Sequence, residues 1–554
     1  MLTDKKIDAV VISSYTFDDK AMITTGGLVH NFKLYLNDNL CSYSFLESYF
    51  RNQRNLNLAE KEWRQIPKIA QTPTFLNGPY LADLLQQKLD FHCETINNFC
   101  HEKDRLEGFL SKQPSYAVIS SSLIMFPQHI TEIIDFIKER VPECQVIVGG
   151  TKLYKSYKIK QLKESGNLLD FTDEWLEHMH YFFGPRKDKA DYYIVNSRGE
   201  STLLKLITAI QKGEDPRSLP NLAYYENDDR CVINGIEDEP YLLGHITIDW
   251  SKVDPDIIGC EVPISVKQGC QYRCNFCDFV GLERKLVTRT DDLIMRELRA
   301  IETSLPGKPV CFVDENMFQS KNHLRRFCSM LIKEKLNIRW RGFTRVDVID
   351  EEMACILRDA GCYFMALGVE SGDQTVLNNM NKKITPELAL NTIYALNRAG
   401  IGTYSTLFIG FPGETDESVQ NTINFLNSYP TGEDGLNFYS VNSFYVLPMS
   451  PVSTPEMRSK FGVHGYFDTW RHDTMNSEEA RDNVLRLFQD VQNCYFVYLD
   501  SAEYTVLRGN IPEHKTIIQT RQDLVRKRVT GISKEEEQGY WDKMEQAFVR
   551  LGDR

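Results

Sequence analysis

Three cysteines in one short loop constrain this 554-residue chain more than any other feature. Cys270, Cys274 and Cys277 have the spacing C-x3-C-x2-C. Three clustered thiols cannot pair off as disulfides, and structural zinc usually takes four ligands in paired C-x2-C or H-x3-H form. No second pair follows, and His323 is the first histidine downstream. Because iron–sulfur clusters are usually held by cysteine thiolates, the spacing predicts a [4Fe–4S] cluster with one iron open; the alternative is three unrelated buried thiols.

The loop resembles the signature of the radical S-adenosylmethionine (radical SAM) superfamily, in which an aromatic residue precedes the third cysteine, as Phe276 does here. The resemblance implies that Cys270, Cys274 and Cys277 are the catalytic cluster ligands, and that SAM chelates the open iron. It also implies that the cluster donates one electron and that SAM is cleaved, usually to a 5′-deoxyadenosyl radical. In such enzymes the cofactors carry the hard chemistry and the protein positions them.

Length and composition limit the other classes. A chain of this length suggests two or three domains, and 42% hydrophobic with 25% charged residues is ordinary for a globular enzyme. The net charge of −13 argues against a general polyanion binder, so we expect no nucleic-acid partner. We interpret the basic stretch Arg521 to Arg528 as a solvated helix face.

The sequence predicts a cytoplasmic protein without a membrane partner. No apolar run reaches the roughly 18–20 residues that span a bilayer. The first residues, Met1 to Lys6, lack the apolar core of a signal peptide. Fourteen irregularly spaced cysteines suit a reducing compartment.

The first part of the chain alternates apolar strand-like runs with helical patterns. The runs are Ile7 to Ser14, Tyr116 to Ser122, Cys144 to Thr151 and Tyr192 to Glu200. Such alternation predicts a parallel sheet with helices on both faces. Residues 16–75 form a polar insert that we do not assign.

These runs end in serine or glycine, and in open α/β sheets ligands bind beyond the carboxyl ends of the strands. Taken alone, Gly149-Gly150 is a tight turn. The order of motifs, however, resembles the Rossmann-like (flavodoxin-like) cobalamin-binding domain that precedes many radical SAM domains. Its usual Gly-Glu-Gly-Glu is reduced here to Arg198-Gly199-Glu200-Ser201. The resemblance implies that cobalamin is bound by Ser120, Ser121, Ser122, Gly149, Gly150, Thr151, Ser197, Gly199 and Glu200.

One histidine motif of cobalamin proteins is incomplete here. Cobalamin-dependent methionine synthase and its relatives carry D-x-H-x-x-G, whose histidine replaces the lower cobalt ligand. Asp90-Phe91-His92 begins this pattern, but Thr95 occupies the glycine position. We therefore predict that no histidine ligates cobalt.

From residue 262 onward strands and helices alternate again. The expected strands are Val262 to Val266, Val310 to Val313, Ile338 to Phe343, Tyr363 to Val369, Ser405 to Gly410 and Ser440 to Val446. Six strand–helix units of this kind predict a partial (β/α)6 TIM barrel that is open on one side. In barrel folds catalysis takes place on the loops after the strands, and the cysteine loop follows the first strand.

Charged residues follow the second and third of these strands. Resemblance places Asp314 or Glu315 at the SAM amino group, and an acid suits an ammonium group; ordinary loop acidity is the alternative. Arg345 is placed to clamp the SAM carboxylate bidentately, with a structural salt bridge to Asp347 as the alternative.

The next two strands end in motifs that are highly specific to the superfamily. The resemblance implies that Glu370 and Ser371 hydrogen-bond the ribose or the amino acid end of SAM. It implies that Ile409 and Gly410, before Phe411-Pro412-Gly413-Glu414-Thr415, pack near adenine.

The chain thus divides into a cobalamin-binding domain with an insert (1–240), a radical SAM partial barrel (241–455) and a substrate-capping region of mixed α/β or helical structure (456–554). The resemblance implies a cobalamin-dependent methyltransferase that acts on an unactivated carbon, or on phosphorus, of a small metabolite or peptide. An external one-electron reductant of the flavodoxin or ferredoxin type is its expected partner. Two alternatives stay open: cobalamin chemistry other than radical methylation, or no functional cobalamin, with aminocarboxypropyl transfer, cyclisation or rearrangement.

Overall fold

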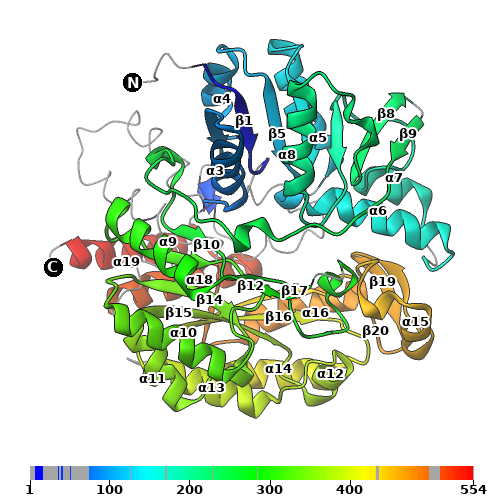
Figure 1. The fold of residues 1–554 in the computed structure, drawn as a ribbon. Coiled ribbons are helices and arrows are strands. Elements are labelled where there is room, and N and C mark those ends of the chain that lie inside the picture. Colours follow the sequence, from blue (N-terminus) through cyan, green and yellow to red (C-terminus); the bar gives the residue numbers. More distant parts are fainter. Residues whose placement is uncertain are drawn as a thin grey trace.

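The computed structural model describes residues 6–15, 35–36, 39–40, 46, 50, 74–124, 126–168, 171–228, 230–282, 285–431, 436–497 and 512–552. Most of the amino-terminal stretch on which the expectation about a signal peptide depends lies outside these residues. Two large sheets dominate the fold, which we call the front sheet and the central sheet. In Figure 1 the front sheet with its helices lies above the central sheet, and the chain passes from one to the other through residues 234–261.

The front sheet has seven strands in the order β4-β1-β5-β6-β7-β8-β9. They are β1 (Ala9–Ile12), β4 (Cys93–Ile96), β5 (Tyr116–Ser120), β6 (Gln145–Gly149), β7 (Tyr192–Ile194), β8 (Leu222–Asn227) and β9 (Arg230–Ile233). The first five strands pair in parallel, and β8 and β9 extend the sheet as an antiparallel hairpin. Numbered along the chain, the parallel part has the 2-1-3-4-5 order of flavodoxin-like sheets.

Helices cover both faces of the front sheet. Successive side chains of a strand point to opposite faces, so each strand contributes to two separate cores. Val10 and Ile12 pack with one set of helices, whereas Ala9 and Val11 pack with the other. The helices around this sheet are α3 (Asn77–Leu89), α4 (Lys103–Leu110), α5 (Pro127–Arg140), α6 (Thr151–Glu164), α7 (Asp173–Met179) and α8 (Glu200–Gln211). The predicted parallel sheet with helices on both faces is confirmed.

The central sheet is parallel throughout, in the order β10-β13-β14-β15-β16-β17-β21. Its strands are β10 (Val262–Ile264), β13 (Val310–Phe312), β14 (Trp340–Thr344), β15 (Cys362–Glu370), β16 (Gly402–Ile409), β17 (Asn437–Ser443) and β21 (Tyr495–Phe496). Its helices are α9 (Asp291–Ser304), α10 (Lys321–Glu334), α11 (Glu351–Asp359), α12 (Gln374–Asn379), α13 (Pro386–Arg398), α14 (Asp416–Asn427) and α16 (Ser477–Asp490). The six predicted strands are present, and the α/β class is confirmed.

A seventh strand comes from the part of the chain that we assigned to the capping region. Tyr495 and Phe496 pair with β17 as β21, and Phe496 is buried. The same part of the chain holds α15 (Pro455–Phe461), β18 (His464–Tyr466), β19 (Thr469–His472), β20 (Met475–Asn476), α18 (Pro512–Thr530) and α19 (Lys534–Gly552). The domain boundaries stay a prediction, but the central sheet extends beyond residue 455.

The basic stretch Arg521 to Arg528 lies within α18, but its interpretation as a solvated face is wrong for two of its arginines. Arg521 and Arg526 are buried. Arg526 donates hydrogen bonds to the carbonyls of Phe488, at 3.0 Å, and Val491. These carbonyls end α16, where the last C=O groups lack helical partners. The arginine therefore serves as a cap for α16.

None of the helices in the described part of the chain combines the length and apolar character needed to cross a bilayer.

Candidate active site

The cysteine loop follows β10 and lies between β11 (Lys267–Gln268) and the 3-10 turn η9 (Asp278–Leu282). Strand β11 pairs antiparallel with β12 (Val287–Thr288), which anchors the start of the loop. Gly269 has φ +87°, a value that side chains disfavour. The amide of Cys277 donates to the carbonyl of Cys274 at 3.1 Å, which folds the end of the loop into a turn.

The three thiols are close enough to influence one another electrostatically. Burial raises the pKa of Cys277 to about 12, and the charges of Cys274 and Cys270 contribute to the increase. Ionising such a group requires a cation, since metal binding displaces the thiol proton. No group of three or more His, Cys, Asp or Glu side chains within the described residues is arranged around a single ion. Thiolates that each bind a different iron of a cluster need not approach as closely as ligands of one ion, so the donor set fits a [4Fe–4S] cluster.

A buried ion pair lies beside the loop. Lys382 Nζ is 2.8 Å from Glu370 Oε1, and both side chains are almost fully buried. Glu370 ends β15 at φ +72° and also accepts a hydrogen bond from Thr406 at 3.2 Å. The ammonium of Lys382 lies 5.7 Å from the ring centroid of Phe276. Lys382 also lowers the pKa of Cys274 against the larger effect of burial, so it stabilises a thiolate there.

Arg345 approaches the loop from the end of β14. Its guanidinium pairs with Asp347 at 3.1 Å, lies 3.9 Å from the ring centroid of Tyr272, and donates from Nη2 to the carbonyl of Lys382 at 2.7 Å. Its Nη1 is buried and has no hydrogen-bond partner among the residues that the structure describes. The salt bridge to Asp347 and a free donor therefore coexist. An unpaired donor of this kind fits a carboxylate, and the role of Arg345 toward SAM stays a prediction.

Asp314 holds the start of the cysteine loop. Its carboxylate accepts hydrogen bonds from the hydroxyl of Ser265 and from the amides of Val266 and Lys267, at 2.8–3.1 Å. Burial raises its pKa to about 6. The ammonium of Lys267 is buried and has no hydrogen-bond partner in the described part of the chain. Burial lowers its pKa, while Cys270, Asp314 and Glu315 oppose that shift. Asp314 and Glu315 thus lie beside the loop, and their contact with SAM stays a prediction.

The other predicted SAM residues lie at the ends of neighbouring strands. Ser371 is buried, and its hydroxyl accepts from the amide of Asp373 at 3.1 Å. Ile409 ends β16, and Gly410 follows at φ +98°. A Cβ on Gly410 would lie 2.5 Å from the ring of Trp470, so the capping region packs directly against this turn. Phe276 lies edge-to-face with Phe408 of β16, with ring centroids 4.9 Å apart.

The predicted cobalamin residues are brought together at the carboxyl ends of β5, β6 and β7. Ser120 is level with Gly149 in the sheet, and the amide of Thr151 donates to Ser122 Oγ at 3.2 Å. A Cβ on Gly150 would lie 2.8 Å from the same oxygen, so the two loops touch. Ser197, Gly199 and Glu200 follow the neighbouring strand β7.

Several polar atoms at this edge are buried and have no hydrogen-bond partner among the described residues. They are Ser13 Oγ after β1, Asn98 Nδ2 after β4 and Ser121 Oγ after β5. Ser13 Oγ packs against Gly78 of α3, where a Cβ would lie 1.9 Å from it. Buried polar groups are normally satisfied, so the atoms of Asn98 and Ser121 fit a polar ligand such as cobalamin along the edge. His92 precedes β4 and therefore lies at the opposite, amino edge, with Nδ1 2.8 Å from the carbonyl of Lys6.

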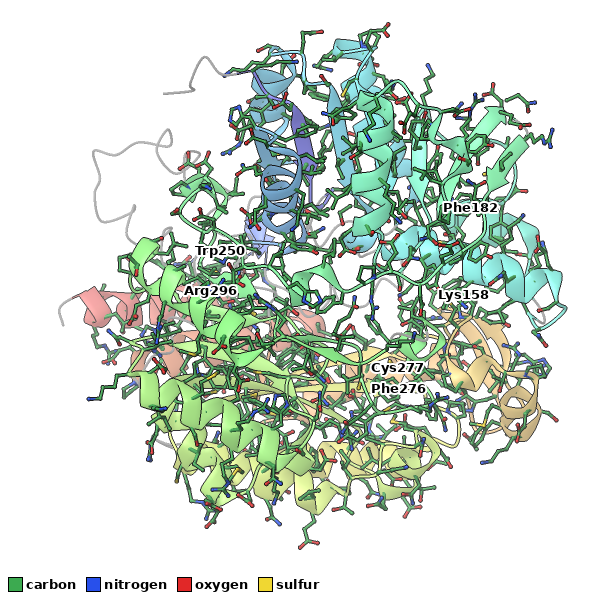
Figure 2. The ribbon with its side chains drawn as sticks, in the orientation of Figure 1. Lys158, Phe182, Trp250, Phe276, Cys277 and Arg296 are labelled. Carbon is green, nitrogen blue, oxygen red and sulfur yellow. The ribbon has the colours of Figure 1, made fainter. Side chains whose placement is uncertain are left out.

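Contacts that the sequence did not reveal join this edge to the cysteine loop. Arg198 donates from Nε to Gln268 at 2.8 Å, and from its Nη atoms to the carbonyls of Glu239 at 2.8 Å and Lys285 at 3.3 Å. Gln268 lies two residues before Cys270. Figure 2 places the labelled Phe276 and Cys277 on the side of the central sheet that faces α6, the helix of Lys158. The sequence marks Arg198 only as a departure from the usual Gly-Glu-Gly-Glu motif, and it does not indicate the partner of this arginine.

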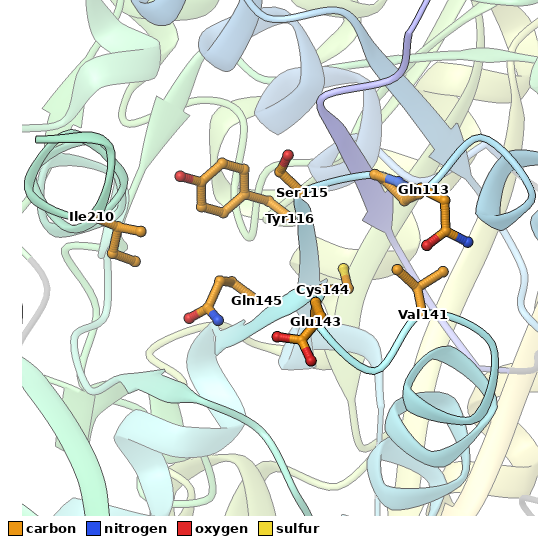
Figure 3. A pocket seen from close by; sticks show the side chains of 9 residues that line it. Gln113, Ser115, Tyr116, Val141, Glu143, Cys144, Gln145 and Ile210 are labelled. Carbon is orange, nitrogen blue, oxygen red and sulfur yellow. The ribbon is translucent and has the colours of Figure 1, made fainter. Parts of the chain in front are cut away.

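A separate hollow of about 370 Å³ lies at the amino ends of β5 and β6 and includes Ser115, Glu143 and Gln145 (Figure 3). It is on the edge opposite the predicted cofactor residues and belongs to neither site.

Comparison with known proteins relates part of the chain to a known family. Residues 264–426 match the model of the Radical SAM superfamily. The chain is 24% identical over 53% of its length to an uncharacterized methyltransferase of Pyrococcus horikoshii, and 27% identical over 41% of its length to an anaerobic magnesium-protoporphyrin IX monomethyl ester cyclase of Rubrivivax gelatinosus. The matched stretches span 66% and 43% of those two proteins.

The fold resembles a solved structure over nearly the whole chain. That structure is the radical SAM methyltransferase TsrM from Kitasatospora setae with cobalamin and a [4Fe–4S] cluster bound. The TM-score is 0.57, with 15% identity and coverage of 99% of this chain and 100% of that one. At this identity the likeness is one of fold.

Proposed function

Because the chain belongs to the radical SAM superfamily, we propose that it is a cobalamin-dependent radical SAM enzyme that methylates an unactivated carbon, or a phosphorus atom, of a small metabolite or peptide. The observation that carries the proposal is the contact of Arg198 with Gln268. This hydrogen bond joins the predicted cobalamin edge to the loop of the cluster ligands. Methyl transfer between two cofactors and one substrate needs such proximity.

The chain's own residues have definable tasks in this proposal. The cluster supplies the electron that cleaves SAM, and cobalamin supplies a methyl carrier. Arg345, held by Asp347 and Tyr272, offers its unpaired Nη1 to the SAM carboxylate. The Lys382–Glu370 pair keeps a cation beside Cys274. Phe276 and Phe408 place an aromatic wall beside the cysteine loop that excludes water.

The closing of the SAM site by neighbouring elements also supports the proposal. Trp470 of β19 packs against Gly410, and its indole N–H donates to the carbonyl of Phe444 at 2.7 Å. His472 of the same strand is 3.1 Å from the carbonyl of Gly410. The capping region is thereby fixed to the predicted adenine site. We assign the capping region the task of covering the substrate. We place the protein in the reducing cytoplasm, with a flavodoxin- or ferredoxin-type protein as its reductant.

A second candidate is a radical SAM reaction without methyl transfer. The relative from Rubrivivax gelatinosus is named a cyclase, and its match covers 41% of this chain. Cyclisation or rearrangement would use the same cluster and SAM residues. Without functional cobalamin, aminocarboxypropyl transfer is the remaining form of this alternative.

The products of SAM distinguish these reactions, because its sulfur carries three different carbon groups. Loss of the methyl group leaves S-adenosylhomocysteine, loss of the adenosyl group gives 5′-deoxyadenosine, and loss of the aminocarboxypropyl group leaves methylthioadenosine. We expect the first two products from anaerobically reconstituted enzyme with cobalamin, SAM and reductant. Methylthioadenosine as the main product, or absence of bound cob(II)alamin in the EPR spectrum, would refute methyl transfer.

The cluster itself is tested by a pair of cysteine variants. We expect Cys274→Ala to lose iron, sulfide and SAM cleavage. Cys355→Ala removes an exposed thiol on α11 and should retain all three, which makes it the matched control. Full turnover of Cys274→Ala would overturn the proposal.

A further inference from the structure

Helix α6 begins at the predicted cofactor edge and carries a cation where helices disfavour one. Its first turn has no acidic residue and contains Lys152, and its N-cap, Gly150, has no side chain to satisfy the amides. The amino end of a helix carries partial positive charge and favours anions. A lysine added there makes the first turn strongly electropositive.

Lys152 has no counter-charge in the described part of the chain. It is partly buried, and burial, together with the nearby charge of Lys155, lowers its pKa to about 7. No carboxylate opposes these two effects. Burying a charge without a partner costs free energy. An anion bound beside Lys152 would stabilise the charged form of this lysine, which burial disfavours.

His180 provides a second unpaired group at the same place. It follows α7, is 5% exposed, and has its Nδ1 3.4 Å from Ser156 Oγ of α6. Its Nε2 is buried and has no hydrogen-bond partner within the described ranges of the chain. The charges that act on it come from Lys152, Lys155 and Lys187, all of them positive. Together with burial they keep the imidazole neutral, so it presents an unpaired ring nitrogen to a cationic space.

The cationic group lies next to the cysteine loop. Lys155, one helical turn after Lys152, is 2.6 Å from Asp278, the residue that follows Cys277. Its ammonium is also 5.4 Å from the ring centroid of Phe279. Three residues of helix rise by about 4.5 Å, which places Lys152 close to the loop. In Figure 1, α6 lies along the side of the front sheet that faces the central sheet.

We propose that Lys152, His180 and the first turn of α6 form a binding site for an oxyanion, a carboxylate or phosphate, of the substrate. The assignment to substrate rests on the proposed function, which puts the substrate between α6 and the cysteine loop. The bound group supplies negative charge beside Lys152 and accepts hydrogen bonds from the first-turn amides that Ser122 does not take. His180 donates to it from Nε2 in the tautomer in which Nδ1 accepts from Ser156 Oγ. The substrate is therefore an acid.

Inorganic phosphate is the probe for the site in the reconstituted holoenzyme. We expect calorimetric titration to show that Lys152→Met binds phosphate at least about tenfold more weakly than the natural protein, a difference of about 1.4 kcal/mol. Lys158→Met removes the same charge from the same helix and should bind as the natural protein does. Without phosphate, Lys152→Met should unfold no earlier than the natural protein, because it loses an unpaired buried charge. Equal affinity of Lys152→Met and the natural protein, or equal losses in both variants, overturns the site.

A second titration identifies the source of the oxyanion. Cobinamide lacks the nucleotide phosphate of cobalamin, so both are titrated into Lys152→Met and the natural protein. We expect Lys152→Met to bind both corrinoids normally. Weakened binding of cobalamin alone would mean that the site holds the cofactor phosphate, and this overturns the assignment to substrate. If the proposed function is wrong, the natural protein will lack the cluster or will not cleave SAM. The phosphate titration does not depend on that result and still decides whether the anion site exists.

Discussion

Replacing Lys382 by methionine tests the buried ion pair that orders the cysteine loop. The substitution keeps an unbranched apolar side chain but removes the ammonium that lies 2.8 Å from Glu370. Glu370 is then left with the hydroxyl of Thr406, at 3.2 Å, as its remaining side-chain partner among the described residues. Breaking a buried pair by removing one member costs about 3–5 kcal/mol. Loss of the cation over the ring of Phe276 adds up to about 1 kcal/mol.

We therefore expect Lys382→Met to lower the free energy of unfolding by about 4 kcal/mol, or roughly a thousandfold in the unfolding equilibrium. Urea unfolding followed by the combined fluorescence of the six tryptophans measures this change, because Trp340 and Trp250 are fully buried in the folded protein. The double variant Glu370→Gln with Lys382→Met removes the stranded charge and should recover more than half of the loss. A loss below about 1 kcal/mol for the single variant, or additive effects in the double variant, would refute the reasoning.

Three further predictions follow from individual side chains. Burial raises the pKa of Glu414 to about 8 from its usual value of about 4.5. Between these two pH values the folded state holds a proton that the unfolded state releases. The free energy of unfolding therefore falls as pH rises through this range, by at most about 1.4 kcal/mol per pH unit. Glu414→Gln should flatten that slope in urea unfolding at several pH values, and an unchanged slope contradicts the assignment. Gly410→Ala should lower the free energy of unfolding by several kcal/mol, because Gly410 has φ +98° and touches Trp470. Gly213→Ala, at φ +70° in open space, should lower it by about 1–2 kcal/mol by the same measurement. Equal losses would contradict the packing argument. His92→Ala should leave the EPR spectrum of bound cob(II)alamin unchanged and free of nitrogen splitting, because His92 lies at the amino edge of the front sheet; a change in that splitting would show that it ligates cobalt.

Local features of the candidate site were predictable because they depend on residues close together in the chain. The spacing of Cys270, Cys274 and Cys277 requires only one loop, and the alternation of apolar runs with helical patterns predicted the parallel strands. Strands were identified even where their ends differed by a few residues, as for the strand predicted at Ile338 to Phe343 and observed as β14. Residues such as Arg345 and Glu370 were found from motifs that follow those strands.

Pairings between distant segments were not predictable from spacing. The Tyr495–Phe496 strand is too short to give a periodic signal, and it is a strand only because β17 presents a free edge to it. Asp314 was expected to face a ligand, yet its hydrogen bonds go to Ser265, Val266 and Lys267, which are near it only in the folded sheet. The burial of Arg526 likewise depends on the end of α16, a separate helix.

The sequence by itself determined the metal-binding chemistry and the α/β class, because ligand spacing and hydrophobic periodicity are properties of short stretches of chain. Tertiary structure alone decided that Arg198 reaches Gln268, that Lys382 pairs with Glu370 beside Cys274, and that Lys152 and His180 share one cationic space. Each of these contacts depends on how two elements pack, and the free energy of packing depends on surfaces that no local pattern records.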